Sequence, residues 1–254
     1  MPRRSNEEKL REYYRALYRA WGAQHWWPGE TRFEVIVGAY LTQNTAWRNV
    51  ELALANLRSA KALSIEGIRE TKISELEQLI RPSGYFRQKA SRLKTFVAFL
   101  DAEFEGSLDQ LFAEPTEKLR ERLLALNGVG PETADSILLY AGNHPVFVVD
   151  AYTRRILERH QILPEKTDYE EIRALFERSL GAITDAQLSM HSDEERESTV
   201  LKTAHSPSPI STARRPPLAQ VYNEMHGLIV SVGKHHCGKL RPQCDGCPLQ
   251  PFLP

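Results

Sequence analysis

The sequence predicts an all-α protein, on three observations. Apolar residues recur at the three- and four-residue spacing of amphipathic helices through most of the chain. Only VFVV at 146–149 has the character of a strand, and four residues are too few to build a sheet. A chain of 254 residues with 41% hydrophobic content is long enough to bury the core of one large or two small domains.

The first expected helix follows Ser5, whose pairing with Glu8 three residues later is typical of a capping box. Its apolar stripe consists of Leu10, Tyr13, Leu17 and Trp21. Residues 33–41, FEVIVGAYL, are apolar on nearly all sides, which predicts a buried central helix rather than a surface helix.

Three further helices are expected before the middle of the chain. Ser74 and Glu77 predict the cap of a short helix that ends before the Pro-Ser-Gly turn at 82–84. Residues 90–100 and 116–126 then have amphipathic spacing, which predicts one helix in each segment.

The helical pattern stops between about 186 and 217. This segment is rich in serine, proline and charged residues and has few apolar ones, which predicts a flexible insert. Helical periodicity returns at 218–232, so we expect the chain to re-enter a folded domain before its C-terminal cysteines.

The charge balance gives no argument for or against a nucleic acid partner, because lysine plus arginine equals aspartate plus glutamate at 33 each. A nucleic acid would therefore have to be bound by a local patch of positive charge. Candidates for such phosphate contacts are Arg154, Arg155, Arg214 and Arg215. The alternative is that these arginines face water, as exposed arginines more often do. No run of 18 apolar residues is present and the first twenty residues are charged throughout, so we expect a cytoplasmic protein without a membrane partner.

Two glycines and a proline interrupt the helices in LNGVGPETAD, residues 126–135. Gly128 and Gly130 allow positive φ and a close approach to the main chain, and Pro131 suits the first turn of the next helix. Amides exposed in this glycine turn (residues 127–130) form a nest for an anion such as a phosphate, a contact that is blind to base sequence. The alternative is an ordinary helix connection in which a glycine ends the first helix.

Asp150 follows Gly130 by twenty residues, in VVDAYTRR. It ends an apolar run and opens a helix that continues through Ile156 and Leu157. One interpretation is a helix N-cap, a common role for aspartate. The other interpretation is a carboxylate held at the mouth of a cleft.

The glycine turn and Asp150, in this order and with this gap, resemble the helix-hairpin-helix Gly/Pro-Asp superfamily of DNA glycosylases, typified by endonuclease III. The resemblance covers most of the chain and includes FEVIVGAYLTQNTAWRNV, GYFRQKASRLK and the C-terminal cysteine spacing. It implies two helical lobes with a cleft in which the DNA lies. Residues 33–148 would form a helical barrel domain with the hairpin, and residues 1–32 with 149–254 a second domain.

By this resemblance, Asp150 is the catalytic carboxylate and Gln43 fills the gap left by an extruded nucleotide. Hydrolysis of an N-glycosidic bond builds positive charge on the sugar, which a fixed anion stabilises, and the base must first leave the duplex. The expected DNA-contacting residues are Gln43, Asn127, Gly128, Val129, Gly130, Glu132 and Thr133. The expected partner is double-stranded DNA with a damaged base, bound by a monomer that is nucleoid-associated if the source is a bacterium.

Glu132 departs from the family. Endonuclease III-type enzymes that also cut the strand carry a lysine two residues after the second glycine, and a glutamate cannot form an imine. The sequence therefore predicts a monofunctional glycosylase, unless Lys89, Lys94 or another lysine substitutes. The alternatives are a glycosylase with AP lyase activity and a non-catalytic DNA-binding protein in which Asp150 only caps its helix.

The expected substrate is a base that leaves readily, such as an N-alkylated purine, whose positive charge weakens the glycosidic bond. Trp26, Trp27 and Trp47 are candidates for stacking on that cation, and the alternative for each is packing in a core. The LTQNTAW and WWP segments and the run at 223–226 resemble the 3-methyladenine DNA glycosylase III branch of the superfamily.

The three cysteines lie near the C-terminus, as Cys237-x6-Cys244-x2-Cys247. A reducing compartment argues against a disulfide framework, and the spacing resembles the family's iron–sulfur loop, which implies a 4Fe-4S cluster. Leu253 stands where the family has its fourth cysteine. Three interpretations stay open: a cluster with His235 or His236 as a further ligand, a zinc ion, and a site without metal.

Overall fold

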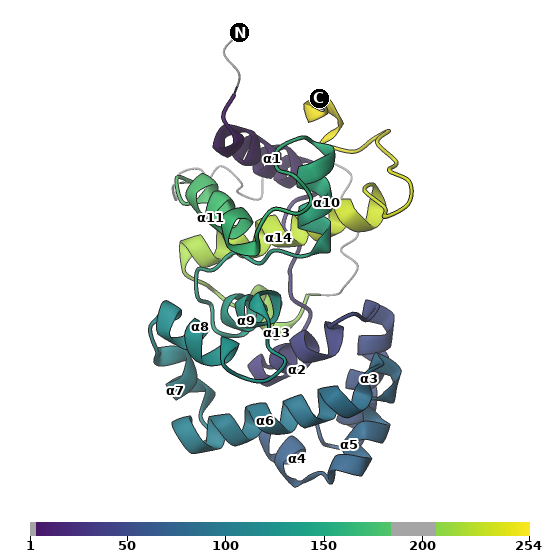
Figure 1. Ribbon diagram of the computed structural model, residues 1–254, viewed down its shortest axis with the longest axis vertical. Coiled ribbons are helices and arrows are strands. Elements are labelled where there is room, and N and C mark those ends of the chain that lie inside the picture. The colour runs from purple at the N-terminus through teal and green to yellow at the C-terminus, as the bar shows by residue number, and fades with distance from the viewer. Residues whose placement is uncertain (1–3, 184–206) are drawn as a thin grey trace. The chain divides into compact units, whose positions relative to one another are not determined.

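The computed structural model describes residues 4–183 and 207–254, which fold into helices joined by loops (Figure 1). No β-strand is present among these residues, and the one extended pairing is an isolated antiparallel bridge between Cys237 and Pro242. The predicted all-α class is therefore confirmed. No helix in the described ranges is long and apolar enough to cross a membrane.

Contacts between residues divide the chain into two compact units. The Asp150 unit consists of the described parts of residues 1–28 and 145–254, and the glycine-turn unit of residues 29–144. The helices of the Asp150 unit are α1 (Asn6–Trp21), α10 (Ala151–Arg159), α11 (Tyr169–Leu180), α13 (Pro209–Thr212), α14 (Pro217–His235) and the 3-10 turn η4 (Gln250–Phe252).

The helices of the glycine-turn unit are α2 (Arg32–Thr42), α3 (Trp47–Ser59), α4 (Ile65–Glu70), α5 (Ile73–Leu79), the 3-10 turn η1 (Arg81–Ser83), α6 (Phe86–Phe104), α7 (Leu108–Ala113), α8 (Thr116–Leu124), α9 (Pro131–Ser136) and the π-helical turn η2 (Ile137–Ala141). Every residue of α2 from Phe33 to Leu41 is buried, as predicted for a central helix. The elements α3, α6, α9 and η2 pack around it.

In the Asp150 unit, α14 is the central helix, and α1, α10 and α11 pack against it (Figure 1). The extended segment at 145–149 also belongs to this unit, because Phe147 stacks on Phe176 of α11 with ring centroids 4.1 Å apart. The border between the units thus falls after residue 144, whereas the sequence placed its domain border after residue 148.

The predicted caps have different outcomes. The capping box of α1 is present, since Ser5 Oγ accepts from the Glu8 amide and Glu8 Oε2 accepts from the Ser5 amide. The cap predicted at Ser74 and Glu77 is wrong. Helix α5 starts two residues earlier, after Lys72, whose carbonyl accepts from the amides of Glu75 and Leu76 without any side-chain cap.

Most of the expected flexible insert, residues 186–206, lies outside the described residues. Its remainder is folded, because α13 begins with a capping box between Ser208 and Ser211. Arg215 is only 7% exposed and donates to the carbonyl of Ile210 at 2.7 Å. This hydrogen bond joins the loop after α13 to the helix itself. The Arg215 side chain therefore binds within the protein, whereas the sequence analysis considered it for a phosphate contact.

Candidate catalytic residues, glycine turn and cysteine cavity

Asp150 lies immediately before α10 and caps it. Its backbone is extended, and its Oδ1 accepts hydrogen bonds from the amide of Thr153 at 2.7 Å and the hydroxyl of Thr153 at 2.8 Å. The N-cap interpretation of Asp150 is confirmed. Because both bonds end on Oδ1, they fix the carboxyl group and leave Oδ2 for another partner.

His226 on α14 faces this second oxygen. Its Nε2 lies 3.7 Å from Asp150 Oδ2, which is too far for a hydrogen bond. Burial lowers the pKa of His226 below its ordinary value, and the neighbouring Asp150 carboxylate only partly opposes this effect. Burial therefore favours the neutral imidazole beside Asp150.

Sequence reasoning noted the run at 223–226 but gave His226 no place beside Asp150, because only the fold brings α14 against α10. Gly233 permits this close approach. A Cβ at this position would lie 2.1 Å from Cδ1 of Tyr152 on α10. A glycine late in an apolar helix was the one sequence signal for this contact.

Glu224 holds the loop at 22–28 against α14. Its Oε2 accepts from the Gln24 amide and its Oε1 from Gln220 Nε2, both at 2.8 Å. Ser231 adds a hydrogen bond of 2.7 Å to Gln24 Oε1. This buried network fixes the start of the segment that carries the two neighbouring tryptophans.

Trp26 and Trp27 are 9% and 5% exposed, and their rings meet edge-on with centroids 5.4 Å apart. Such burial is what the packing interpretation requires. Trp47 lies in the other unit, at the start of α3 and partly exposed. The assignment of these three side chains to a base pocket stays a prediction.

Glu224 makes the stability of the protein depend on pH. Burial raises the pKa of this carboxyl from its ordinary 4.5 to about 7. A raised folded-state pKa favours folding fully below the unfolded pKa, and this contribution is lost as pH rises through about 7. We expect wild type to lose on the order of 3 kcal/mol relative to Glu224→Gln between pH 4.5 and 8. Urea unfolding of both proteins measures this, and a difference that is constant with pH would contradict a raised pKa.

The glycine turn connects α8 and α9. Gly128 has φ +80°, and a Cβ there would come within 1.9 Å of Arg92 Nε, so both conformation and space favour glycine. Gly130 has φ −93°, which any residue adopts, and a Cβ there would meet nothing. The expectation of positive φ at both glycines is wrong for Gly130, because Pro131 follows it in an ordinary extended entry to α9.

The glycine turn lies at the surface in part, because Gly130 is exposed and Gly128 is half-buried. In the described part of the chain, neither the Gly128 nor the Gly130 amide donates a backbone hydrogen bond. Of the other expected DNA-contacting residues of the turn and α9, Asn127 and Glu132 are exposed, whereas Val129 and Thr133 are buried. The amides therefore retain the capacity to bind an anion.

Gln43, expected to enter the DNA, is hydrogen-bonded to the glycine turn. Its Nε2 donates to the Gly128 carbonyl at 3.0 Å and to Thr133 Oγ1 at 2.9 Å, and its Oε1 accepts from Arg92 Nη1 at 2.6 Å. The structure thus brings Gln43, Gly128 and Thr133 together. Insertion into a duplex would require release of these bonds and stays a prediction.

A buried ion pair joins the two helices that flank the glycine turn. Arg120 of α8 and Asp135 of α9 meet at 2.6 Å and 3.2 Å in a bidentate arrangement, with side chains 9% and 0% exposed. Sequence reasoning missed this pair, because Asp135 is one of many charged residues on amphipathic segments. The pair fixes α8 against α9 and hence the geometry of the turn between them.

Lys89 is 1% exposed and is no free amine. Its Nζ donates to Leu41 O, Thr45 Oγ1 and Ser83 O at 2.7 to 2.8 Å, which uses all three protons. Burial, with a smaller effect of Arg92, lowers the pKa of Lys89 to about 8. Even so, an amine enclosed in this way cannot reach a sugar without unfolding its surroundings. Lys94, the other lysine considered, donates to the Arg69 carbonyl at 2.9 Å.

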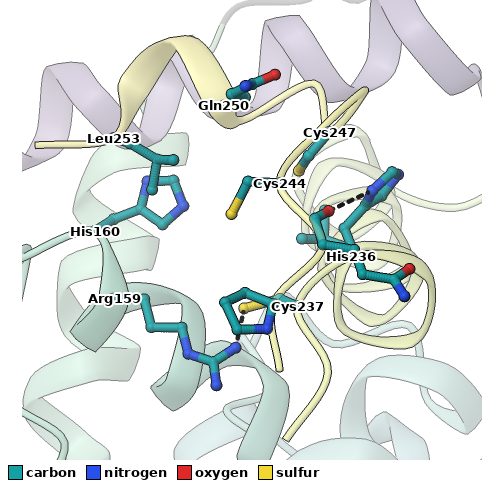
Figure 2. A pocket seen from close by; sticks show the side chains of 11 residues that line it. Arg159, His160, His236, Cys237, Cys244, Cys247, Gln250 and Leu253 are labelled. Atoms are coloured by element: carbon teal, nitrogen blue, oxygen red, sulfur yellow. Dashed lines mark hydrogen bonds between the residues drawn. The ribbon is translucent and has the colours of Figure 1, made fainter. Parts of the chain in front are cut away.

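The three cysteines line one cavity of about 270 Å³ (Figure 2). Cys237 follows α14, and the loop after it supplies Cys244 and Cys247. Leu253 and His236 also line the cavity, whereas His235 is exposed and does not. Within the described ranges, no group of three histidine, cysteine or acidic side chains is arranged to hold a single metal ion.

Arginines of α10 hold this loop. Arg159 donates to Cys237 Sγ at 3.2 Å and to the carbonyl of Gly238 at 2.8 Å, and Arg155 donates to the Cys237 carbonyl at 2.7 Å. Arg154 donates to the carbonyl of Thr167. Three of the arginines considered from the sequence as phosphate ligands, Arg154, Arg155 and Arg215, thus contact backbone carbonyls of their own unit.

The family of the chain follows from comparison with known proteins. A model of the HhH-GPD superfamily of base excision DNA repair proteins matches residues 37–182, more than half of the chain. The chain belongs to this superfamily. A protein from Methanocaldococcus jannaschii that carries the name of a DNA repair glycosylase is 38% identical over 247 residues, which cover 96% of each chain. Endonuclease III-like protein 1 from Bos taurus is 26% identical over 92% of this chain and 64% of its own length.

Solved structures of the superfamily share the fold. The crystal structure of the H. pylori 3-methyladenine DNA glycosylase bound to 1,N6-ethenoadenine is 29% identical, with a TM-score of 0.71 over 91% of this chain and 98% of that one. A trapped covalent intermediate of endonuclease III with DNA has a TM-score of 0.69 at 19% identity, which shows likeness of fold alone.

Proposed function

We propose that this DNA glycosylase of base-excision repair is monofunctional, and that Asp150 is the charged group that assists hydrolysis of the N-glycosidic bond. The observation that carries the proposal is the geometry of the Asp150 carboxyl. Two hydrogen bonds from Thr153 fix its Oδ1, and its Oδ2 lies 3.7 Å from Nε2 of His226, whose pKa burial lowers. A fixed carboxylate is what a reaction with a cationic transition state requires.

The chemical step breaks the bond between C1′ and the base nitrogen, and the bonding electrons leave with the base. Positive charge then develops on the sugar, where the Asp150 carboxylate stabilises it until a water adds to C1′ and releases its extra proton to the solvent. Thr153 occupies Oδ1 with both of its hydrogen bonds. We therefore assign Oδ2 to the sugar or to the attacking water.

The proposed DNA contacts lie on the glycine turn. The Gly128 and Gly130 amides would bind a phosphate of the duplex, with the exposed Asn127 beside them. Gln43 would enter the gap left by the extruded nucleotide once its hydrogen bonds to the Gly128 carbonyl and to Thr133 are released.

We further propose that the substrate is an N-alkylated purine. The support is the 29% identity to the H. pylori 3-methyladenine DNA glycosylase over almost the whole of both chains. Trp26, Trp27 and Trp47 are proposed to provide the aromatic faces that a cationic base favours. A base that carries a positive charge leaves readily, so the reaction needs no strong acid.

A 4Fe-4S cluster is the cofactor that the family implies. The chain fits this group in part, because Cys237, Cys244 and Cys247 line one cavity while Leu253 offers no ligand atom. A bound cluster would cross-link the cysteine loop and fix it against α10. No step of the proposed reaction passes through it.

We expect that the protein does not cleave the DNA strand through an imine. Glu132 replaces the lyase lysine and Lys89 is enclosed by three acceptors, so borohydride should trap no covalent adduct on abasic DNA. Duplexes that each hold one lesion, incubated with protein and then with hot alkali, should release base without a nick before the alkali. A borohydride adduct would contradict monofunctional action and favour the AP lyase alternative, with Lys94→Ala as the first variant to localise it.

A further inference from the structure

We propose that Arg92 of α6 is the charged ligand of the DNA phosphate that binds at the glycine turn. This inference rests on the proposed function, because it adds a side chain to the phosphate contact assigned there to the Gly128 and Gly130 amides. Sequence reasoning gave Arg92 no role, because position 92 is one of several charged positions in an amphipathic segment.

The first argument is the position of Arg92 against the glycine turn. A Cβ at position 128 would overlap Nε and Cζ of Arg92, so the guanidinium fills the space that the glycine leaves open. The absence of a side chain at position 128 thus brings a cation into contact with the main chain of the turn. This is the main chain whose amides would bind the phosphate.

The second argument is that the charge of Arg92 is not neutralised. Among residues 4–183 and 207–254, no carboxylate forms an ion pair with Arg92, and its one hydrogen bond runs from Nη1 to Gln43 Oε1 at 2.6 Å. Most N–H donors of this half-buried guanidinium therefore remain available. The charge is also felt one turn earlier on α6, where burial lowers the pKa of Lys89 and Arg92 lowers it further.

The third argument is that the glycine turn itself supplies no positive charge. Its residues, Asn-Gly-Val-Gly, are neutral, and Glu132 in the first turn of α9 is an exposed negative group. A guanidinium–phosphate contact is charge-assisted and bidentate, which makes it stronger than a contact to neutral amides. Arg92 therefore supplies the charge that the amides lack and offsets the repulsion between Glu132 and a phosphate.

Arg92 also connects the phosphate contact with Gln43. In the proposed function Gln43 leaves the glycine turn and enters the duplex, which breaks the one hydrogen bond that Arg92 forms within the described part of the chain. A half-buried cation that loses its acceptor is destabilised unless another acceptor replaces it. A phosphate at the turn is such an acceptor, so binding of the phosphate compensates Arg92 for the release of Gln43.

The test is the salt dependence of binding to undamaged duplex DNA, measured with the full chain by fluorescence anisotropy. Each phosphate contact adds about 0.9 to the steepness with which log K falls against log salt concentration. We expect Arg92→Met to bind about 10-fold more weakly than wild type at low salt. Its slope should be less steep by about 0.9, so the wild-type advantage in affinity should shrink about 3.5-fold between about 50 and 200 mM salt.

Two further variants separate a phosphate contact from mechanical support of the turn. Arg92→Lys keeps the charge and should keep the wild-type slope, although it should bind more weakly because an ammonium does not form the bidentate contact. Arg69→Gln is the matched control, because Arg69 is an arginine of the same unit that pairs with Asp101, and it should also keep the wild-type slope. Melting temperatures show whether each variant is folded, and Arg92→Gln replaces Arg92→Met if the latter is not.

The outcomes distinguish this inference from the proposed function. An unchanged slope in Arg92→Met, with wild type bound to the duplex, would overturn the inference and leave the amides as the phosphate ligands. A slope reduced equally in Arg92→Lys would also overturn it, because a change in the turn rather than the loss of charge would then weaken binding. Failure of wild type to bind duplex DNA would instead contradict the proposed function itself.

Discussion

The replacement Asp150→Asn is expected to slow base excision by about 10² to 10³-fold, the size of effect seen when one preorganised electrostatic partner of a transition state is removed. The asparagine Oδ1 accepts the two hydrogen bonds from Thr153 that the aspartate now accepts, and asparagine caps helices about as well as aspartate. The variant therefore loses the negative charge and keeps the helix. Single-turnover excision rates and the melting temperature measure the two properties separately.

Asp168→Asn is the matched control. Asp168 also caps a helix of the same unit, α11, by accepting from the Glu170 amide at 2.8 Å. This control should keep both the excision rate and the melting temperature. Excision at the wild-type rate by Asp150→Asn, with an unchanged melting temperature, would reduce Asp150 to a helix cap and show that another group assists the reaction. The non-catalytic DNA-binding alternative instead predicts no excision by the wild-type protein either.

The features that the sequence predicted well are local ones. The capping box at Ser5, the buried helix at 33–41 and the helix that opens at Asp150 all depend on residues within a few positions of one another. Helical periodicity and cap chemistry act over this range, so a sequence pattern contains the information. The glycine turn was predicted for the same reason, although only Gly128 needs its positive φ.

The features that the sequence did not predict join residues far apart in the chain. Gln43 bonds to Gly128 across 85 positions, and Glu224 bonds to Gln24 across 200. No periodic pattern encodes such partners, because they depend on which helix faces are packed together. The same limit applies to Lys89, which a sequence pattern treats as a surface amine or a nucleophile and which the fold encloses.

The largest expected loss of stability is that of Asp135→Asn. The substitution leaves the Arg120 guanidinium buried without its counter-charge, and breaking one side of a buried pair costs about 3 to 5 kcal/mol of unfolding free energy. Urea unfolding followed by circular dichroism measures the change. Asp101→Asn is the matched control, because Asp101 forms a bidentate pair with Arg69 in the same unit but at the surface, where the change should be far smaller.

A double variant separates the cost of an uncompensated charge from the loss of the pair itself. Replacement of both Arg120 and Asp135 by leucine removes both charges, and apolar replacements of buried pairs are often neutral or stabilising, so most of the lost stability should return. The bidentate pair would still be missing, however. The angle between α8 and α9 at the glycine turn should therefore no longer be fixed. We therefore expect a stable double variant with weakened binding to undamaged duplex DNA. Wild-type binding by that variant would show that the ion pair serves stability alone.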